Sequence, residues 1–440
     1  MCGYLGYISN NKFDDRILEV ANKRLICRGP DQTVSLQNNE LNFDIPNKFA
    51  HFSFHRLSII DLSNLASQPM LSNEFNTALM FNGEIYNHEE LRSYLVKKGL
   101  KFKSNHSDSE VVLLGISRFG ISFVEKLIGQ FAISFLDNKS NKLYLVRDRL
   151  GQKPLFYSLL GNQILFSSNL KSINDLLSCE VASESLNEYL NYGVVSSPNT
   201  IYQNIFKLKP GEILEYDIDT NSYKTNLYWK PEEFISNNTF EKSNFFDLFS
   251  NAVSIRQNAD VPVANFLSGG IDSTAIVKSI SFQNKQVNTF SIGFESDKYD
   301  ESTWSNIAAQ QFETNHLLKK IKTDIDLELI NESIQIFDEP YSDPSTLPSY
   351  ILSKEISKNY KVAISGDGGD ELLGGYDRVY KSLKRKKYKI LSGLLFKLYK
   401  PNFGTGTRIK INNENLATSY SSFFEDEKLM SLLKVNHVSK

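Results

Sequence analysis

The stretch FLSGGIDST, residues 266–274, combines hydroxyl groups, glycines and a carboxylate at close spacing. An apolar run at 261–267 leads into it and a helical pattern at 275–280 follows, which predicts a strand, a tight turn and a helix. Gly269 and Gly270 would let the backbone approach a ligand closely. Hydroxyls and free N–H groups at a helix start favour an anion, so the stretch predicts a phosphate or pyrophosphate site. The alternative is an ordinary strand-to-helix turn.

Cys2 is a second candidate, because removal of the initiator Met would leave it at the N-terminus. A free α-amino group has a pKa near ~8 and can act as the general base for the thiol of its own residue. The alternating residues 3–8 predict a short strand that could bury this terminus. Chance is the alternative, since any residue can follow Met.

Three further places in the first half carry groups that suit a small polar ligand. Arg56 follows a strand-like run and could bind a carboxylate, or it could form a surface ion pair. Asn82 and Gly83 could form an oxyanion hole with an amide and a backbone N–H, although Asn-Gly is also a common hairpin turn. Asp108 could receive a substrate ammonium group, or it could cap the helix expected at 111–119.

Composition excludes several classes of protein. The chain has 440 residues, which predicts roughly two or three domains, and its net charge of -2 indicates no general attraction to nucleic acid or anionic membranes. The cysteines at 2, 27 and 179 show no pairing or zinc-binding spacing. No apolar run reaches the ~18 residues of a membrane span, and the N-terminus does not resemble a signal peptide. We therefore expect a soluble, reduced, cytoplasmic protein.

The pattern of predicted secondary structure changes near the middle of the chain. Residues 1–215 are rich in short strands, residues 216–240 form a polar connection, and residues 241–440 alternate helix and strand, which predicts a parallel sheet with helices on both faces. Glycine-rich turns follow two of these strands, so we expect both at one sheet edge, where ligands bind. Asp272 and Asp370 in these turns could hold Mg²⁺ on a triphosphate, or they could cap helices. No Walker A lysine follows either turn, which argues against a P-loop NTPase.

Motifs spread from residue 1 to about 380 occur in an order that resembles the glutamine-hydrolysing asparagine synthetases. They are MCG at the N-terminus, RGPD at 28–31, HRLSIID at 55–61, FNGEIYN at 81–87, SDSE at 107–110, RDRLGQKPLFY at 147–157, SGGIDS at 268–273, FSIGF at 290–294, YDES at 299–302, DEPYSDPS at 338–345 and SGDGGDELLGGY at 365–376.

The resemblance implies an N-terminal αββα domain of the N-terminal-nucleophile hydrolase fold, a class II glutamine amidotransferase. A parallel-sheet α/β ATP-pyrophosphatase domain would follow it. Cys2 would attack the glutamine amide, with Asn82 and Gly83 as the oxyanion hole. The resemblance assigns glutamine binding to Arg56, Ile60, Asn82, Gly83, Glu84 and Asp108.

The resemblance also implies ATP and Mg²⁺ as cofactors, with Mg²⁺ at Asp272 and Asp370. ATP contacts would come from Phe266, Ser268, Gly269, Gly270, Asp272, Ser273, Ile292, Ser365, Gly366 and Asp367. The implied reaction makes L-asparagine from L-aspartate, with ammonia passed from L-glutamine through an internal tunnel. Members are often dimers, so a homodimer is one expectation.

The family pattern continues beyond the GGY motif with a VRxPFLD motif and a lysine that this sequence lacks. The basic run 381–389 is expected to be a solvated helix face, and we expect the second domain to be incomplete. Three other functions remain open. The chain could be an amidotransferase for another carboxylate acceptor, it could be only a glutaminase, or it could be a non-catalytic remnant that binds glutamine or nucleotide.

Overall fold

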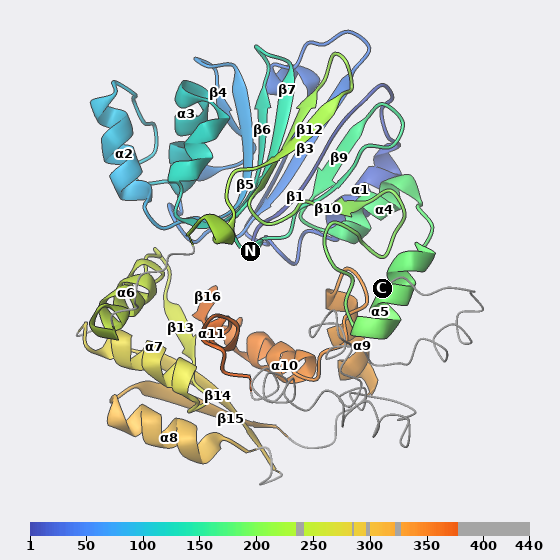
Figure 1. Ribbon diagram of the computed structural model, residues 1–440. Coiled ribbons are helices and arrows are strands. Elements are labelled where there is room, and N and C mark those ends of the chain that lie inside the picture. The colour runs from blue at the N-terminus through green and yellow to red at the C-terminus, as the bar shows by residue number, and fades with distance from the viewer. Residues whose placement is uncertain (235–241, 284–285, 296–299, 322–326, 377–440) are drawn as a thin grey trace. The chain divides into compact units, whose positions relative to one another are not determined.

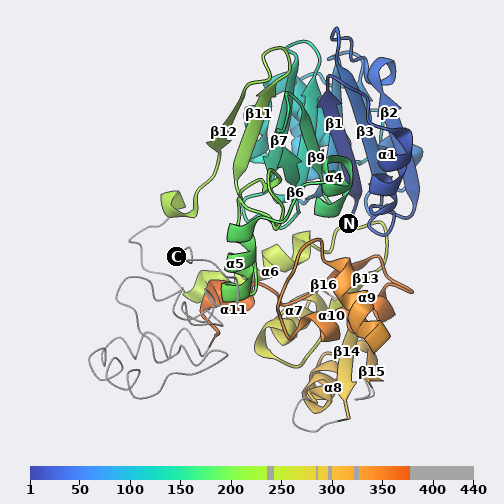
Figure 2. The ribbon, with the colours of Figure 1, turned by 90° about the vertical axis from the view of Figure 1, so that its right-hand side faces the viewer.

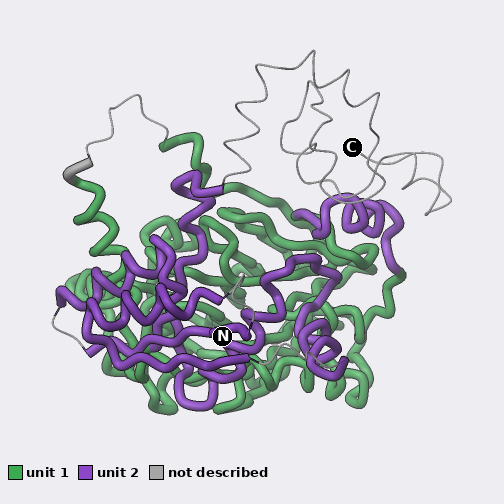
Figure 3. The backbone as a smooth tube through the Cα atoms, turned by 90° about the horizontal axis from the view of Figure 1, so that it is seen from below, with its two compact units in different colours: residues 1–180, 197–263 green, residues 181–196, 264–440 purple. Residues whose placement is uncertain are grey.

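The computed structural model describes residues 1–234, 242–283, 286–295, 300–321 and 327–376 (Figure 1). The basic run 381–389 lies outside the described residues. By its internal contacts the chain divides into two compact units (Figure 3). The first unit is Met1–Glu180 with Ser197–Val263, and the second is Val181–Ser196 with Ala264–Lys440.

Two six-stranded antiparallel sheets form the centre of the first unit. Their strand orders are β10-β8-β9-β1-β3-β2 and β12-β11-β7-β6-β5-β4. The first sheet contains β1 (Gly3–Ser9), β2 (Gln32–Gln37), β3 (Phe49–Arg56), β8 (Phe156–Ser158), β9 (Ile164–Ser167) and β10 (Phe206–Lys207). The second contains β4 (Met70–Ser72), β5 (Thr77–Ile85), β6 (Gly129–Asp137), β7 (Lys142–Arg147), β11 (Glu212–Asp217) and β12 (Tyr223–Leu227).

Helices cover the outer faces of both sheets. In Figure 1, α1 (Asp15–Lys23) and α4 (Leu170–Leu177) lie on one side and α2 (His88–Lys97) and α3 (Asp108–Phe119) on the other; Figure 2 is seen from the α1 and α4 side. Strand β5 shows why four layers form, because successive side chains of a strand point to opposite faces. Ala78 and Met80 join the core between the sheets, whereas Leu79 and Phe81 join the core beneath α2 and α3. The predicted αββα architecture is confirmed.

The second unit is built on a sheet of order β15-β14-β13-β16. The pairs β13–β14 and β14–β15 are parallel, which confirms the predicted parallel α/β architecture. Helix α10 packs through Leu352 and Ile356 on Ala264 and Phe290 of the sheet. The strands of this sheet are β13 (Val263–Phe266), β14 (Asn288–Phe294), β15 (Asn315–Ile321) and β16 (Val362–Ile364). The helices of the second unit are α5 (Ser183–Tyr192), α7 (Ile271–Ser281), α8 (Ser302–Gln311), α9 (Leu327–Ile336), α10 (Thr346–Ile356) and α11 (Gly369–Leu373). Helix α6 (Lys242–Ile255) belongs to the first unit.

The structure corrects some local expectations. Asn82 and Gly83 lie within β5, paired with Ala132 and Phe131, so the hairpin-turn interpretation is wrong. Part of the polar segment expected to connect two domains forms the edge strand β12, which pairs with β11. No helix in the described ranges has both the length and the apolar character that crossing a membrane requires.

Gly6 of β1 gives a test of the packing between strands. An ideal Cβ on Gly6 would lie 2.3 Å from Cζ of Phe166, its partner across the β1–β9 pair. We expect Gly6→Ala to destabilise the protein by about 1–3 kcal/mol because the buried ring has no room to move. Thermal unfolding of Gly6→Ala, Phe166→Leu and the double variant checks this. In the double variant the loss should be smaller than the sum of the single losses, and additive losses would contradict the proposed clash.

Candidate active site

The Cys2 thiol contacts the backbone of Leu57, the residue that follows strand β3. Gly3 of β1 pairs with His55, so the same register sets Cys2 opposite Arg56 and next to Leu57. The sulfur accepts a hydrogen bond from Leu57 N–H at 3.4 Å and lies 3.7 Å from the Leu57 carbonyl oxygen, to which it can donate. Burial raises the pKa of the Cys2 thiol. The thiol is therefore neutral near pH 7 and needs a base before it can act as a nucleophile.

The amino group next to this thiol is that of Met1, and its surroundings suit such a base. Burial lowers the pKa of the Met1 ammonium to about 6, and the nearby cations Lys153 and Arg28 also lower it. Arg28 Nε further donates to the Cys2 carbonyl at 3.3 Å, which fixes the start of the chain. An amine in these surroundings is neutral at pH 7, which is the form that can accept a proton.

Asn82 points into the space between the two sheets. Alternation along β5 puts its side chain on the same face as Ala78 and Met80, which belong to the core that Cys2 packs against. Asn82 is fully buried, and its amide nitrogen and oxygen have no hydrogen-bond partner within the described part of the chain. A buried amide without partners is unfavourable by about 1–3 kcal/mol. The side chain is thus suited to donate to a ligand that enters this space.

The backbone of Gly83 faces the open edge of β5. The N–H and C=O of Phe131, its partner on β6, both bond to Asp148, at 3.1 and 2.9 Å. Gly83 and Phe131 therefore form a non-hydrogen-bonded pair, and the Gly83 N–H points away from β6. Ile85, two residues further, points its N–H the same way and donates to Asp108 Oδ2 at 3.1 Å. The predicted oxyanion-hole groups thus lie on adjacent residues of one strand.

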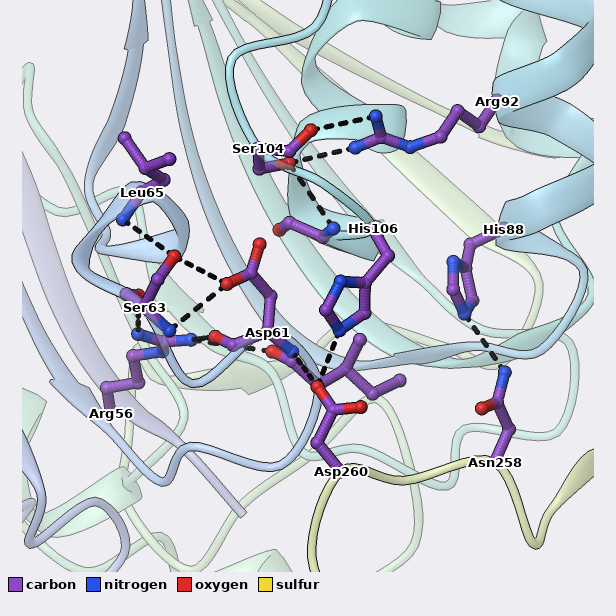
Figure 4. Close-up of polar contacts among 12 residues, drawn as sticks. Arg56, Asp61, Ser63, Leu65, His88, Arg92, Ser104, His106, Asn258 and Asp260 are labelled. Atoms are coloured by element: carbon purple, nitrogen blue, oxygen red, sulfur yellow. Dashed lines mark hydrogen bonds and ion pairs between the residues drawn. The ribbon is translucent and has the colours of Figure 1, made fainter.

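Arg56 is buried and holds a loop rather than a surface carboxylate (Figure 4). Its guanidinium donates to the carbonyls of Ser63 at 2.9 Å, of Ile60 at 3.4 Å, and of Asp61. The surface ion-pair alternative is therefore wrong. Burial lowers the pKa of Arg56, while the neighbouring Cys2 and acidic groups raise it.

Asp108 is the first residue of α3, whose N-cap is Ser107. The carboxyl group is buried, and this burial raises its pKa to about 7. Glu84 contributes to the rise by charge repulsion. Burial likewise raises the pKa of Glu84, against the opposing effect of Lys153 and the amino terminus. The site thus holds two buried acids with raised pKa values.

Lys153 is a residue of this site that the sequence patterns did not indicate. It is buried beside Glu84, and burial lowers the pKa of its ammonium. The turn at 147–151 was predicted only as a charged turn. Asp148 organises it by accepting four backbone N–H groups, those of Phe131, Leu150, Gln152 and Lys153. The feature of the sequence that could have identified Lys153 is its place in the RDRLGQKPLFY motif.

In the second unit, the predicted strand–turn–helix stretch forms as β13, a glycine turn and α7. Gly269 has a φ of 85°, and a Cβ there would lie 2.5 Å from the backbone of Trp304. The turn is closed by side chains: Ser268 Oγ accepts from Gly270 N–H at 3.1 Å and lies 3.0 Å from Ser273 Oγ. Phe266 and Ile292 lie in the neighbouring strands β13 and β14.

The second glycine-rich turn meets the first because β16 neighbours β13. A Cβ on Gly369 would lie 2.7 Å from Asp272 Cγ, and one on Gly366 would lie 3.0 Å from Asp272 Cβ. The glycines thus leave room for the Asp272 carboxylate. Asp367 lies in this turn, and its carboxylate accepts from Ser365 Oγ at 2.9 Å. Asp370 follows in the first turn of α11. No group of three or more His, Cys, Asp or Glu side chains in the described ranges could hold a metal ion.

The raised pKa of Asp108 has a consequence for stability. Between its ordinary value of 3.8 and about 7, the folded protein keeps a proton that the unfolded chain releases, so stability falls as pH rises. Asn cannot ionise, so Asp108→Asn should gain stability relative to the original chain between pH 5 and pH 8, by about 2–3 kcal/mol. Chemical unfolding at both pH values measures this gain. An equal difference at the two pH values would show that Asp108 is ionised throughout.

Both halves of the chain match known protein families. Residues 1–229 match the glutamine amidotransferase domain and residues 244–428 match the asparagine synthase family. The glutamine-hydrolysing asparagine synthetase 1 of Bacillus subtilis is 32% identical over 409 residues, 90% of this chain and 62% of the relative. A relative from Methanocaldococcus jannaschii, named "Putative asparagine synthetase [glutamine-hydrolyzing] 2", is 35% identical, over 86% of this chain and 76% of its own length.

The chain thus spans 62% of the length of the Bacillus relative. The matches cover both units and include the stretches that carry the two sites described above. The chain belongs to the family of glutamine-hydrolysing asparagine synthetases.

Proposed function

We propose that this chain hydrolyses L-glutamine to L-glutamate and ammonia and uses the ammonia in ATP-dependent synthesis of L-asparagine from L-aspartate, with AMP and pyrophosphate released. The observation that carries the proposal is the buried Asn82 amide, which has no hydrogen-bond partner among the described residues. It lies on the face of β5 that points into the core between the two sheets, against which Cys2 packs. A glutamine amide in this space would give Asn82 the partner it lacks. The family relationship supports the corresponding assignment for the second half.

The glutaminase step follows from the groups around Cys2. After Met1 is removed, the α-amino group of Cys2 takes the thiol proton, and the sulfur attacks the amide carbon of glutamine. Asn82 Nδ2 and the Gly83 N–H stabilise the negative oxygen of the tetrahedral intermediate. The proton passes to the leaving nitrogen, ammonia departs, and water hydrolyses the thioester to release glutamate. Burial of the thiol makes the neighbouring amine necessary, since the free thiolate is scarce.

Charged groups around Cys2 suit the amino-acid end of glutamine. Arg56 supplies a buried cation for the α-carboxylate, with the backbone at Ile60 beside it. Asp108 and Glu84 supply anions for the α-ammonium. The raised pKa values of both acids would fall when that cation binds, because an opposite charge favours the ionised form.

The second unit supplies the nucleotide site of the proposal. The turn Ser268–Gly270 precedes the N-terminus of α7, a favourable place for pyrophosphate. Phe266, Ile292 and the turn at 365–367 would contact the rest of ATP. Asp272 and Asp370 would hold Mg²⁺, an ion that is commonly bound by one or two carboxylates together with phosphates and water. It would offset the charge of the triphosphate when bound.

Within this proposal, residues 1–215 are the glutaminase domain, 216–240 the connection and 241–440 the ATP-pyrophosphatase domain. A cytoplasmic location fits a chain whose three cysteines are all free.

Replacement of the proposed nucleophile tests the first half-reaction. Cys2→Ala should reduce glutamate release from glutamine by at least about 10³-fold, because no other thiol can form the thioester. Ammonia-dependent asparagine formation should persist. Cys27→Ala is the matched control and should retain activity, since Cys27 is exposed. Mass spectrometry must show loss of Met1; glutamine hydrolysis by Cys2→Ala would refute the assignment of the nucleophile.

The acceptor is tested by isotope exchange. With ATP and Mg²⁺, L-aspartate should stimulate exchange of labelled pyrophosphate into ATP, because adenylation of a carboxylate is reversible before ammonia attacks. Asp272→Asn should reduce this exchange and leave glutaminase activity unchanged. Exchange that another carboxylate stimulates and aspartate does not would show a different acceptor. Glutamine hydrolysis without any exchange would mean that the chain is only a glutaminase.

A further inference from the structure

A short segment from the second half of the sequence packs on the glutamine site of the first half. This docking segment, residues 256–260, lies between α6 and β13, within the stretch that matches asparagine synthase, yet it belongs to the first compact unit. Its alternate side chains contact that unit. The guanidinium carbon of Arg256 lies 4.8 Å from the ring centroid of Tyr86, and Asn258 Nδ2 lies 3.1 Å from His88 Nε2.

Asp260 makes the most extensive of these contacts (Figure 4). Its carboxylate Oδ2 accepts from Asp61 N–H at 2.7 Å and lies 2.6 Å from His106 Nε2. Its own N–H donates to the Ile59 carbonyl at 3.0 Å. Burial favours a higher pKa for Asp260, but the hydrogen bonds from His106 and Asp61 outweigh it and lower the pKa.

These contacts fall next to the residues assigned to glutamine binding. Ile59 and Asp61 flank Ile60, and His106 precedes Asp108 by two residues on the way into α3. Asp260 therefore bridges two separate parts of the proposed site. Tyr86, beneath Arg256, follows Glu84 by two residues, so the docking segment also reaches the end of β5.

The geometry of the peptide groups shows what Asp260 controls. A peptide group is planar, so fixing its N–H also fixes its C=O. The N–H of Asp61 and the C=O of Ile60 belong to one such group; Asp260 binds the N–H and Arg56 binds the C=O. The C=O of Ile59 and the N–H of Ile60 belong to the preceding group, and Asp260 N–H binds that carbonyl. Asp260 thus clamps both peptide groups that flank Ile60.

We propose that Asp260 is a positioning residue for glutamine binding, which acts from the second half of the chain through the peptide groups at 59–61 and the Arg56 guanidinium. The inference rests on the proposed glutaminase function. Loss of the carboxylate would free the peptide between Ile60 and Asp61 to rotate, and Arg56 would lose a carbonyl that orients it. The effect should appear in binding of glutamine and not in the chemistry at Cys2.

The size of the effect follows from the exposure of the contacts. The side chains of His106 and Asp260 are 43% and 37% exposed, so the contact between them contributes little and the backbone hydrogen bond dominates. We expect Asp260→Ala to raise the KM for glutamine about fivefold with kcat within about twofold. This is less than the roughly tenfold or more that loss of a charged hydrogen bond made directly to glutamine would give, because Asp260 acts only through the backbone and Arg56. Asp260→Asn keeps an oxygen acceptor for Asp61 N–H and should stay within about twofold in KM.

The experiment measures glutamate release by the full chain at varied glutamine concentrations. Glu332→Gln is the matched control, because Glu332 and Lys354 form an ion pair of the same 2.6 Å length and similar exposure in the second unit. This variant should leave the KM unchanged. An unchanged KM in Asp260→Ala would overturn the proposal, as would an equal rise in Asp260→Asn or in the control.

Hydrogen exchange tests the clamp without reference to activity. The Asp61 amide should exchange at least about tenfold faster in Asp260→Ala than in Asp260→Asn, because only the first variant lacks an acceptor. Equal exchange in both variants would also overturn the proposal. If the unaltered chain releases no glutamate but the exchange result holds, the glutaminase assignment fails while the clamp itself stands.

Discussion

A single buried carboxylate, Asp148, fixes the backbone on which the proposed glutaminase site depends. It is 1% exposed and accepts four backbone N–H groups, each a charge-assisted bond of about 1.5–3 kcal/mol. By drawing Phe131 toward itself it leaves the Gly83 N–H on the open edge of β5. By ordering the turn before Lys153 it places a cation near Glu84 and the amino terminus. Arg147 holds the same turn from its other side through the carbonyls of Gly151 and Lys153.

Much of the fold follows from local patterns in the sequence. Strand β5 is buried on both faces along most of its length, and it contains the continuous apolar run ALMF at 78–81. The edge strands β12 and β15 lack such a run because they expose much of their length to solvent. The Asn82-Gly83 pair misleads for another reason, since its pairing with β6 depends on residues almost fifty positions away in the sequence.

The candidate sites show the same difference between local patterns, which the sequence reveals, and contacts between distant residues, which it does not. The turn at 268–270 is a local strand–turn–helix unit, so its form is predictable from spacing alone. Its approach to Gly366 and Gly369 also requires β16 to lie beside β13, an order that the sequence does not specify. Arg56 and Asp108 are recognisable by residue type, but their bonds to backbone groups are not. Asp260 reaches Asp61 across 199 residues of sequence, and no pattern near either residue signals that contact.

The two compact units exchange segments along the chain. Residues 181–196, which contain α5, belong to the second unit, whereas α6 and the docking segment belong to the first. A single cut between the family matches, after residue 229 and before 244, would therefore leave each half without a piece of its own packing. Recombination that replaces one unit needs junctions after Glu180, Ser196 and Val263 together. Such a chain is difficult to assemble from interchangeable modules.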